Sequence, residues 1–153
     1  MMEYGYSEKV LDVFKNPHNI GEIKDADAIG KVGNPACGDL LWMFLKIGKG
    51  RHVIEDAKVK TFGCVAAIAT SSILTDMIKG KTLEDALRIS KQDVVSELNG
   101  LPRQKVHCSV LAVDALKEAA YDYYTRSGIS VPEDVKRAHE HNSIVAERIE
   151  HME

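Results

Sequence analysis

The sequence lacks several features that would assign a function class at once. Its 153 residues contain no apolar run near the roughly 20 residues of a membrane-spanning helix, and no signal-peptide apolar core follows the N-terminus. A dense Lys/Arg tract is also missing, and 20 basic against 23 acidic residues give a net charge of −3. We therefore expect no membrane partner, no nucleic-acid partner and a cytoplasmic location.

Cysteine is scarce as well. The chain has three, Cys37, Cys64 and Cys108, and an odd number excludes a closed disulfide framework and favours a reducing compartment. They are 27 and 44 positions apart, so none forms the C-x-x-C pair of a zinc finger or ribbon. Any site that they share must be assembled by the fold from distant elements.

What the sequence does contain is an ordinary globular composition, with 44% hydrophobic and 28% charged residues. It has no internal repeat and no low-complexity tract. Its length suits one domain with a sizeable core. Because Ser127 and Gly128 end the apolar patterning and Pro132 opens a new segment, we expect a compact domain over residues 1–128 and a C-terminal helical tail over 129–153.

The hydrophobic patterns mix strands and helices. Strands are predicted over residues 28–32, 40–45 and 53–62. The second is apolar on both faces, as in a central strand, and a short loop joins it to the third as an antiparallel hairpin. Helices are predicted over residues 7–16, 65–78, 82–85, 93–98 and 106–124. In the last of these, one seam of small and apolar residues would face the sheet: Cys108, Leu111, Ala112, Ala115 and Ala119.

The tail has its own pattern. Its apolar or small residues fall in heptad a/d order, with Asn142 filling the gap, at Val135, Ala138, Val145, Ile149 and Met152. An amphipathic helix lying on the domain is the favoured interpretation, and a coiled coil between chains is the alternative. His139 and His141 are two positions apart and point to different faces, which argues against a metal pair.

Three cysteine contexts point to one site. Cys37 and Asp39 are two residues apart in a segment where Gly33, Pro35 and Gly38 are expected to turn the chain. Cys64 and Cys108 each fall at the predicted start of a helix, where free backbone N–H groups favour a thiolate. His107 adjoins Cys108. The candidate ligands are therefore Cys37, Asp39, Cys64, His107 and Cys108.

Thiolates with one oxygen or nitrogen ligand suit either zinc or an iron-sulfur cluster. A carboxylate is harder and exchanges with water more readily than a fourth thiolate, so a cluster held in this way should be removable. Purely structural zinc remains an alternative. A Cys/His hydrolase is disfavoured, because no third orienting residue or nucleophile elbow accompanies Cys37 or Cys108.

Several motifs resemble one family. They are Tyr6-Ser7-Glu8-Lys9-Val10 with Asn16-Pro17, Gly33-Asn34-Pro35-Ala36-Cys37-Gly38-Asp39, Phe62-Gly63-Cys64-Val65-Ala66-Ala67-Ile68-Ala69 and Lys105-Val106-His107-Cys108-Ser109. In this order, over residues 3 to 125, they are similar to the IscU-type (NifU N-terminal-like) iron-sulfur cluster assembly scaffolds. The resemblance implies an α+β fold with a three-stranded antiparallel sheet and helices packed on it. It further implies that Cys37, Cys64 and Cys108 hold a nascent 2Fe-2S cluster, with Asp39 or His107 near the fourth position, and that the chain itself turns over no substrate.

The same resemblance implies partners. Sulfur would arrive as persulfide from a pyridoxal-phosphate cysteine desulfurase, a ferredoxin is a candidate electron donor, and the cluster would pass to apo iron-sulfur acceptor proteins. Zinc is the alternative occupant of the cluster-free form.

Two comparisons with the family pattern refine this reading. The family's Leu-Pro-Pro-Val-Lys epitope for a dedicated Hsp70-type chaperone is Leu101-Pro102-Arg103-Gln104-Lys105 here, so we expect that chaperone not to recognise it. The zinc-binding sulfur-transfer branch, which accepts persulfide from a cysteine desulfurase, carries an insertion between its second and third cysteines. The corresponding stretch here looks uninserted, which favours the scaffold.

Overall fold

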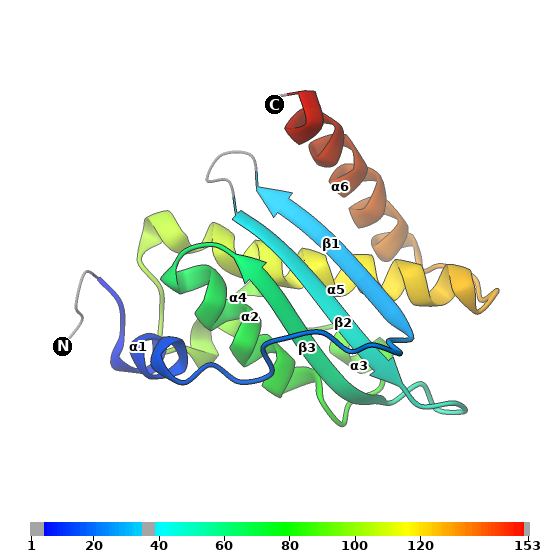
Figure 1. Ribbon diagram of the computed structural model, residues 1–153, viewed down its shortest axis with the longest axis horizontal. Helices are drawn as coiled ribbons and strands as arrows, with labels where there is room; N and C mark the ends of the chain where they lie inside the picture. Colours follow the sequence, from blue (N-terminus) through cyan, green and yellow to red (C-terminus); the bar gives the residue numbers. More distant parts are fainter. Residues whose placement is uncertain (1–4, 35–38, 152–153) are drawn as a thin grey trace.

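The computed structural model describes residues 5–34 and 39–151, with side chains at 5–33 and 39–142. Its centre is an antiparallel sheet of three strands in the order β1-β2-β3, formed by β1 (Ala28–Asn34), β2 (Asp39–Ile47) and β3 (Ile54–Phe62). The helices α2 (Val65–Ile78) and α5 (His107–Arg126) cover one face and lie behind the sheet in Figure 1. The α+β fold with a three-stranded antiparallel sheet is confirmed.

Four helices and one 3-10 turn complete the part of the chain that the structure describes. They are α1 (Glu8–Lys15), α3 (Leu83–Ala86), α4 (Lys91–Glu97), the 3-10 turn η1 (Arg103–Lys105) and α6 (Glu133–His151). Ser7 caps α1 by accepting a hydrogen bond from the Val10 N–H at 3.1 Å, and Thr82 caps α3 in the same way. Among the helices at the described positions, none combines the length and apolar character that crossing a membrane requires.

The core lies between the sheet and α2 with α5. Leu41, Met43 and Leu45 of β2 alternate toward it, and each is at most 1% exposed. The seam predicted for α5 is buried along its whole length. Contact between α5 and β1 is close, because a Cβ added at Gly30 would lie 2.4 Å from both the Ala115 carbonyl oxygen and the Ala119 nitrogen. The small residues of both elements therefore set the distance between helix and sheet.

Three details differ from the sequence prediction. Gly33 is not a turn residue, because β1 continues to Asn34 and Gly33 pairs with Leu40. The helix predicted from Asp93 begins at Lys91, since Ser90 and Asp93 form a capping box that places the start earlier. The long helix runs to Arg126 instead of Tyr124. The other expected turn residues, Pro35 and Gly38, lie outside the described residues.

The described part of α6 packs on the domain. Val135 is fully buried in the main core. His139 stacks on Tyr121 with ring centroids 3.7 Å apart, and its Nδ1 lies 2.6 Å from Glu118 Oε1. These contacts support the amphipathic-helix interpretation as far as Asn142, whereas the side chains of Val145, Ile149 and Met152 lie outside the described set. The division at residue 128 stays a prediction.

Candidate metal centre

Three elements bring three predicted site residues to one end of the sheet. Asp39 is the first residue of β2, Cys64 is the N-cap of α2, and Cys108 is the second residue of α5. Figure 1 shows why they meet: β2 begins, and β3 ends, at the end of the sheet from which α2 departs. The predicted placement of both thiols at helix starts is therefore confirmed.

The donor atoms form a tight triangle. Cys64 Sγ lies 3.6 Å from Cys108 Sγ, and Asp39 Oδ2 lies 3.8 Å from the first sulfur and 3.9 Å from the second. Asp39 is 5% exposed and Cys108 is 1% exposed, whereas Cys64 is half-buried. Tetrahedral coordination with metal–sulfur bonds of about 2.3 Å separates two sulfurs by about 3.8 Å. The triangle therefore matches the donor spacing around a single ion.

The turn between β3 and α2 makes room for the carboxylate. A Cβ added at Gly63 would lie 3.0 Å from Asp39 Cγ and 2.9 Å from the Ala67 Cβ. Any larger residue at position 63 would crowd the Asp39 carboxylate and the first turn of α2, so one of them would have to shift. Gly63 is thus part of the site although it carries no functional group. In the sequence, only its position directly before Cys64 indicated this role.

The walls of the site are small and apolar, with one cation. Ala66, Ala67 and Cys108 form a buried cluster, and Tyr6 and Leu101 pack against it. Burial raises the pKa of the Tyr6 hydroxyl, and the nearby Cys64 raises it further.

Lys105 of η1 supplies the positive charge beside the thiols. Its pKa is raised mainly by the charge of Cys64, with smaller contributions from Tyr6, Cys108 and Asp39. An ammonium group here offsets part of the negative charge that two thiolates and a carboxylate bring together. Tyr6 and Lys105 lie within the motifs that resemble the family, but sequence reasoning gave neither a role at the metal centre, because neither is adjacent to a cysteine and only the fold places them there.

His107 lies near the triangle but outside it. It is the first residue of α5, and its Nε2 is buried with no hydrogen-bond partner among the described residues. A buried imidazole nitrogen in this state is costly unless it gains a partner. Its role as a ligand stays a prediction. Cys37, the remaining predicted ligand, lies outside the described residues.

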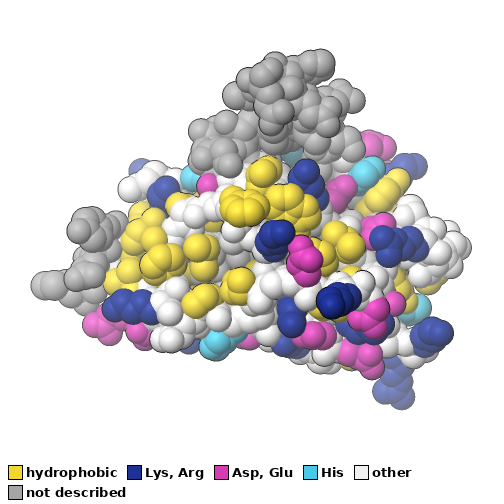
Figure 2. Space-filling model, viewed as in Figure 1, with side chains coloured by type: hydrophobic (Ala, Val, Ile, Leu, Met, Phe, Trp, Pro, Cys, Tyr) yellow, Lys and Arg dark blue, Asp and Glu magenta, His cyan; other side chains and the backbone are white. Residues whose placement is uncertain are grey.

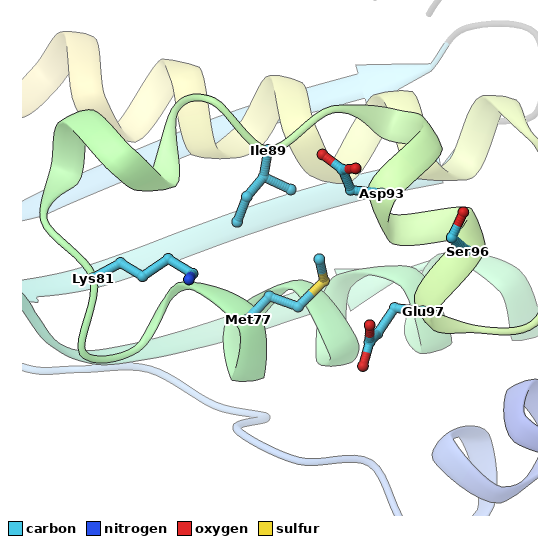
Figure 3. A pocket seen from close by; sticks show the side chains of 6 residues that line it. All are labelled: Met77, Lys81, Ile89, Asp93, Ser96 and Glu97. Carbon is cyan, nitrogen blue, oxygen red and sulfur yellow. The ribbon is translucent and has the colours of Figure 1, made fainter.

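A hollow between α2 and α4 has a different lining from the metal centre. About 450 Å³ in volume, it lies between α2 and α4 and is lined by Met77, Lys81, Ile89, Asp93, Ser96 and Glu97. Figure 3 shows Asp93, Ser96 and Glu97 on one side of it and Met77 on the other. It has no thiol or imidazole, and Asp93 already accepts a hydrogen bond from the Ser90 N–H. The hollow therefore lacks the sulfur and imidazole donors that the metal centre brings together.

Comparison with known proteins agrees with this geometry. Residues 5–129 match the NifU-like N terminal domain family. The iron-sulfur cluster assembly scaffold protein IscU 1 of Archaeoglobus fulgidus is 56% identical over 123 residues, covering 80% of this chain and 79% of that protein. The IscU scaffold of Aquifex aeolicus is 48% identical over 127 residues, covering 83% of this chain and 81% of that protein.

A solved structure shares the fold. The N-terminal part of a NifU-like protein from Brucella abortus superposes with a TM-score of 0.61 at 21% sequence identity, covering 78% of this chain and 94% of that chain. With the family match over most of the chain, the chain belongs to the NifU-like N-terminal family of IscU-type iron-sulfur cluster assembly scaffold proteins.

Proposed function

We propose that this protein is a scaffold on which a 2Fe-2S cluster is assembled from iron and desulfurase-derived sulfur, and from which the cluster is transferred to apo-acceptor proteins. The observation that carries the proposal is the convergence of Asp39, Cys64 and Cys108 from three separate elements, in a chain whose relatives are named cluster assembly scaffolds. The cluster is cargo that the protein holds and releases, so we propose no catalytic turnover.

The donor set suits the first stage of this process. Two thiols and a carboxylate spaced for one ion would receive the first iron, or zinc in the cluster-free protein. We propose that Cys37, two positions before Asp39, supplies the third thiolate when the second iron enters. We also propose that His107 is an alternative nitrogen ligand for the position of Asp39. Lys105 would lower the repulsion among the anionic ligands as they lose their protons.

The sulfur chemistry requires partners. A persulfide delivers sulfur at the oxidation level of the element, so each atom needs two electrons to become a bridging sulfide. We propose a cysteine desulfurase as the sulfur donor and a ferredoxin as the electron donor, acting in a cytoplasm that keeps the thiols reduced. A dedicated Hsp70 chaperone is not proposed, because Arg103 and Gln104 stand in the segment where the family carries the epitope.

Anaerobic reconstitution tests the function. Protein incubated with iron, cysteine and a desulfurase should develop visible charge-transfer bands and bind iron and acid-labile sulfide in equal amounts. Cys37→Ser, Cys64→Ser and Cys108→Ser should each abolish or severely weaken cluster retention, because a hydroxyl replaces thiolate poorly on iron. Thermal melting of each cluster-free variant controls for folding. A colourless wild-type protein that keeps stoichiometric zinc would contradict the proposal and support a zinc-binding sulfur-transfer role.

A further inference from the structure

The face of the sheet turned away from α2 and α5 has its own pattern. Residues paired across antiparallel strands share a face, so the register defines rows across the sheet. One row consists of Lys31, Trp42 and Lys60. The next row toward the metal centre carries Leu40 and Phe62. We call this side of the sheet the outer face.

Aromatic residues lie in successive rows of the outer face, beginning at its end next to the metal centre. Phe62 is 61% exposed, and its ring meets that of Trp42 edge to face, with centroids 5.8 Å apart. Farther from the metal centre, Phe44 pairs with Ile29 and Lys58, and Ile29 is 38% exposed. Figure 2 looks onto this side and shows hydrophobic side chains with both basic and acidic side chains beside them. Phe44 is only 7% exposed and Trp42 is half-buried, so the accessible apolar patch consists of Phe62, the exposed part of Trp42 and Ile29. An exposed apolar patch of this kind is a candidate binding surface.

Lysine is the only charged residue type in the part of this face nearest the metal centre. The three rows nearest the metal centre carry Lys31, Lys58 and Lys60 and no carboxylate, although the whole chain has a net charge of −3. Lys31 Nζ lies 5.3 Å from the centre of the Trp42 ring, and Lys60 Nζ lies 6.0 Å from it. Lys60 also pairs at 3.1 Å with Glu22, and both are solvent-exposed. A cationic rim around an apolar centre is complementary to an acidic surface that bears apolar side chains.

The outer face ends at the metal centre. Leu40 directly follows Asp39 in β2, and only Gly63 separates Phe62 from Cys64. A partner bound over Leu40 and Phe62 would therefore lie beside Asp39 and Cys64. We propose that the outer face docks an acidic acceptor protein with exposed apolar side chains. The choice of an acceptor rests on the proposed function.

The experiment uses the single tryptophan as a reporter. The cluster-free, ¹⁵N-labelled protein is titrated with an acidic apo-ferredoxin, and the Trp42 indole N–H resonance is followed in low and high salt. The resonance should shift saturably, and binding should weaken as salt rises. Lys31→Glu with Lys60→Glu should weaken binding on the order of tenfold and reverse its salt dependence. Phe62→Ala should weaken it in both low and high salt.

A matched charge change separates the face from overall electrostatics. Lys49→Glu with Lys91→Glu alters the net charge equally at two exposed lysines outside the outer face, and it should leave the affinity within about twofold. The proposal is overturned if the two double variants bind ferredoxin with the same affinity, or if the indole resonance stays fixed while ferredoxin binds. It is also overturned if the resonance shifts with the protein's own concentration, because a second copy of the chain would then occupy the outer face. Because the titration uses cluster-free protein, its result does not depend on whether a cluster can be reconstituted with iron and sulfide. In that separate reconstitution experiment, the lysine variants should form as much cluster as wild type.

Discussion

Asp39 joins a hard oxygen donor to two soft sulfur donors in a buried setting. A scaffold has to complete its cluster and then release it, and thiolates alone would hold it firmly. We predict that Asp39→Ala retains its cluster longer in air and transfers it more slowly to an apo-ferredoxin, because the exchangeable carboxylate is gone. We expect the imidazole of His107, whose Nε2 has no hydrogen-bond partner among the described residues, to replace it.

The decay of the visible bands and the rate of transfer measure this effect. Asp76→Ala is a suitable control, because it also removes a carboxylate. Asp76 lies on α2, the helix that begins directly after Cys64, but it is exposed and hydrogen-bonded to His18. Faster cluster loss in Asp39→Ala than in wild type would instead make Asp39 an ordinary stabilising ligand.

Asp114 on α5 links stability to pH. Burial raises the pKa of its carboxyl above the ordinary 3.8, against the opposing charges of Lys117 and His141. A raised pKa in the folded state means that ionisation at neutral pH destabilises the fold, and that this penalty disappears as pH falls below 3.8.

We therefore predict that Asp114→Asn raises the melting temperature at neutral pH by about 2 °C and that this gain shrinks steadily on acidification. Melting curves of both proteins between neutral and acidic pH measure the difference. A gain that is independent of pH would show that the effect does not come from the charge of Asp114.

At the scale of elements, the contact between β1 and α5 leaves no room for a side chain at Gly30. Gly30→Ala would place a methyl group against the backbone of Ala115 and Ala119, which cannot rotate away. We predict a loss of about 2 kcal/mol or more in the free energy of unfolding, because α5 has to move off the sheet. Since α5 also carries Cys108, zinc affinity of the variant should fall as well.

Denaturant unfolding and zinc titration test both expectations for Gly30→Ala. Gly48→Ala is the control, because an added Cβ there meets only the flexible carboxylate end of Glu55. Equal stability of the two variants would contradict the close-packing argument.

Local patterns predicted most elements, because their signals lie within a few residues. The apolar run before Lys46 marked the central strand, and the small residues after Cys64 marked α2. The convergence of distant thiols was a hypothesis from motif contexts and family resemblance, and geometry now places two of them with Asp39. The positions of Tyr6 and Lys105 beside them depend on how α1 and η1 pack, which no local pattern encodes.

For the molecule as a whole, α6 adds stability to the domain. Val135 is completely buried, and His139 and Asn142 both contact the carboxylate of Glu118. We predict that truncation after Gly128 lowers the melting temperature without changing the oligomeric state, because the buried Val135 side chain alone contributes roughly 1.5 kcal/mol or more. Light scattering and thermal melting on the full and truncated chains measure this. A change from dimer to monomer on truncation would support the coiled-coil alternative.

The small sheet is closed at its sides by the rest of the chain. Along β3, the Val59 N–H donates to the Asn19 carbonyl, and the Ile54 N–H donates to the Lys81 carbonyl. On the other side, the Ile29 N–H of β1 donates to Asp122 Oδ2, and α6 contacts the same strand. Occupied edges of this kind do not template another strand. The protein should therefore resist fibril growth by strand addition even when it accumulates at high concentration, and recognition of its sheet is left to side chains.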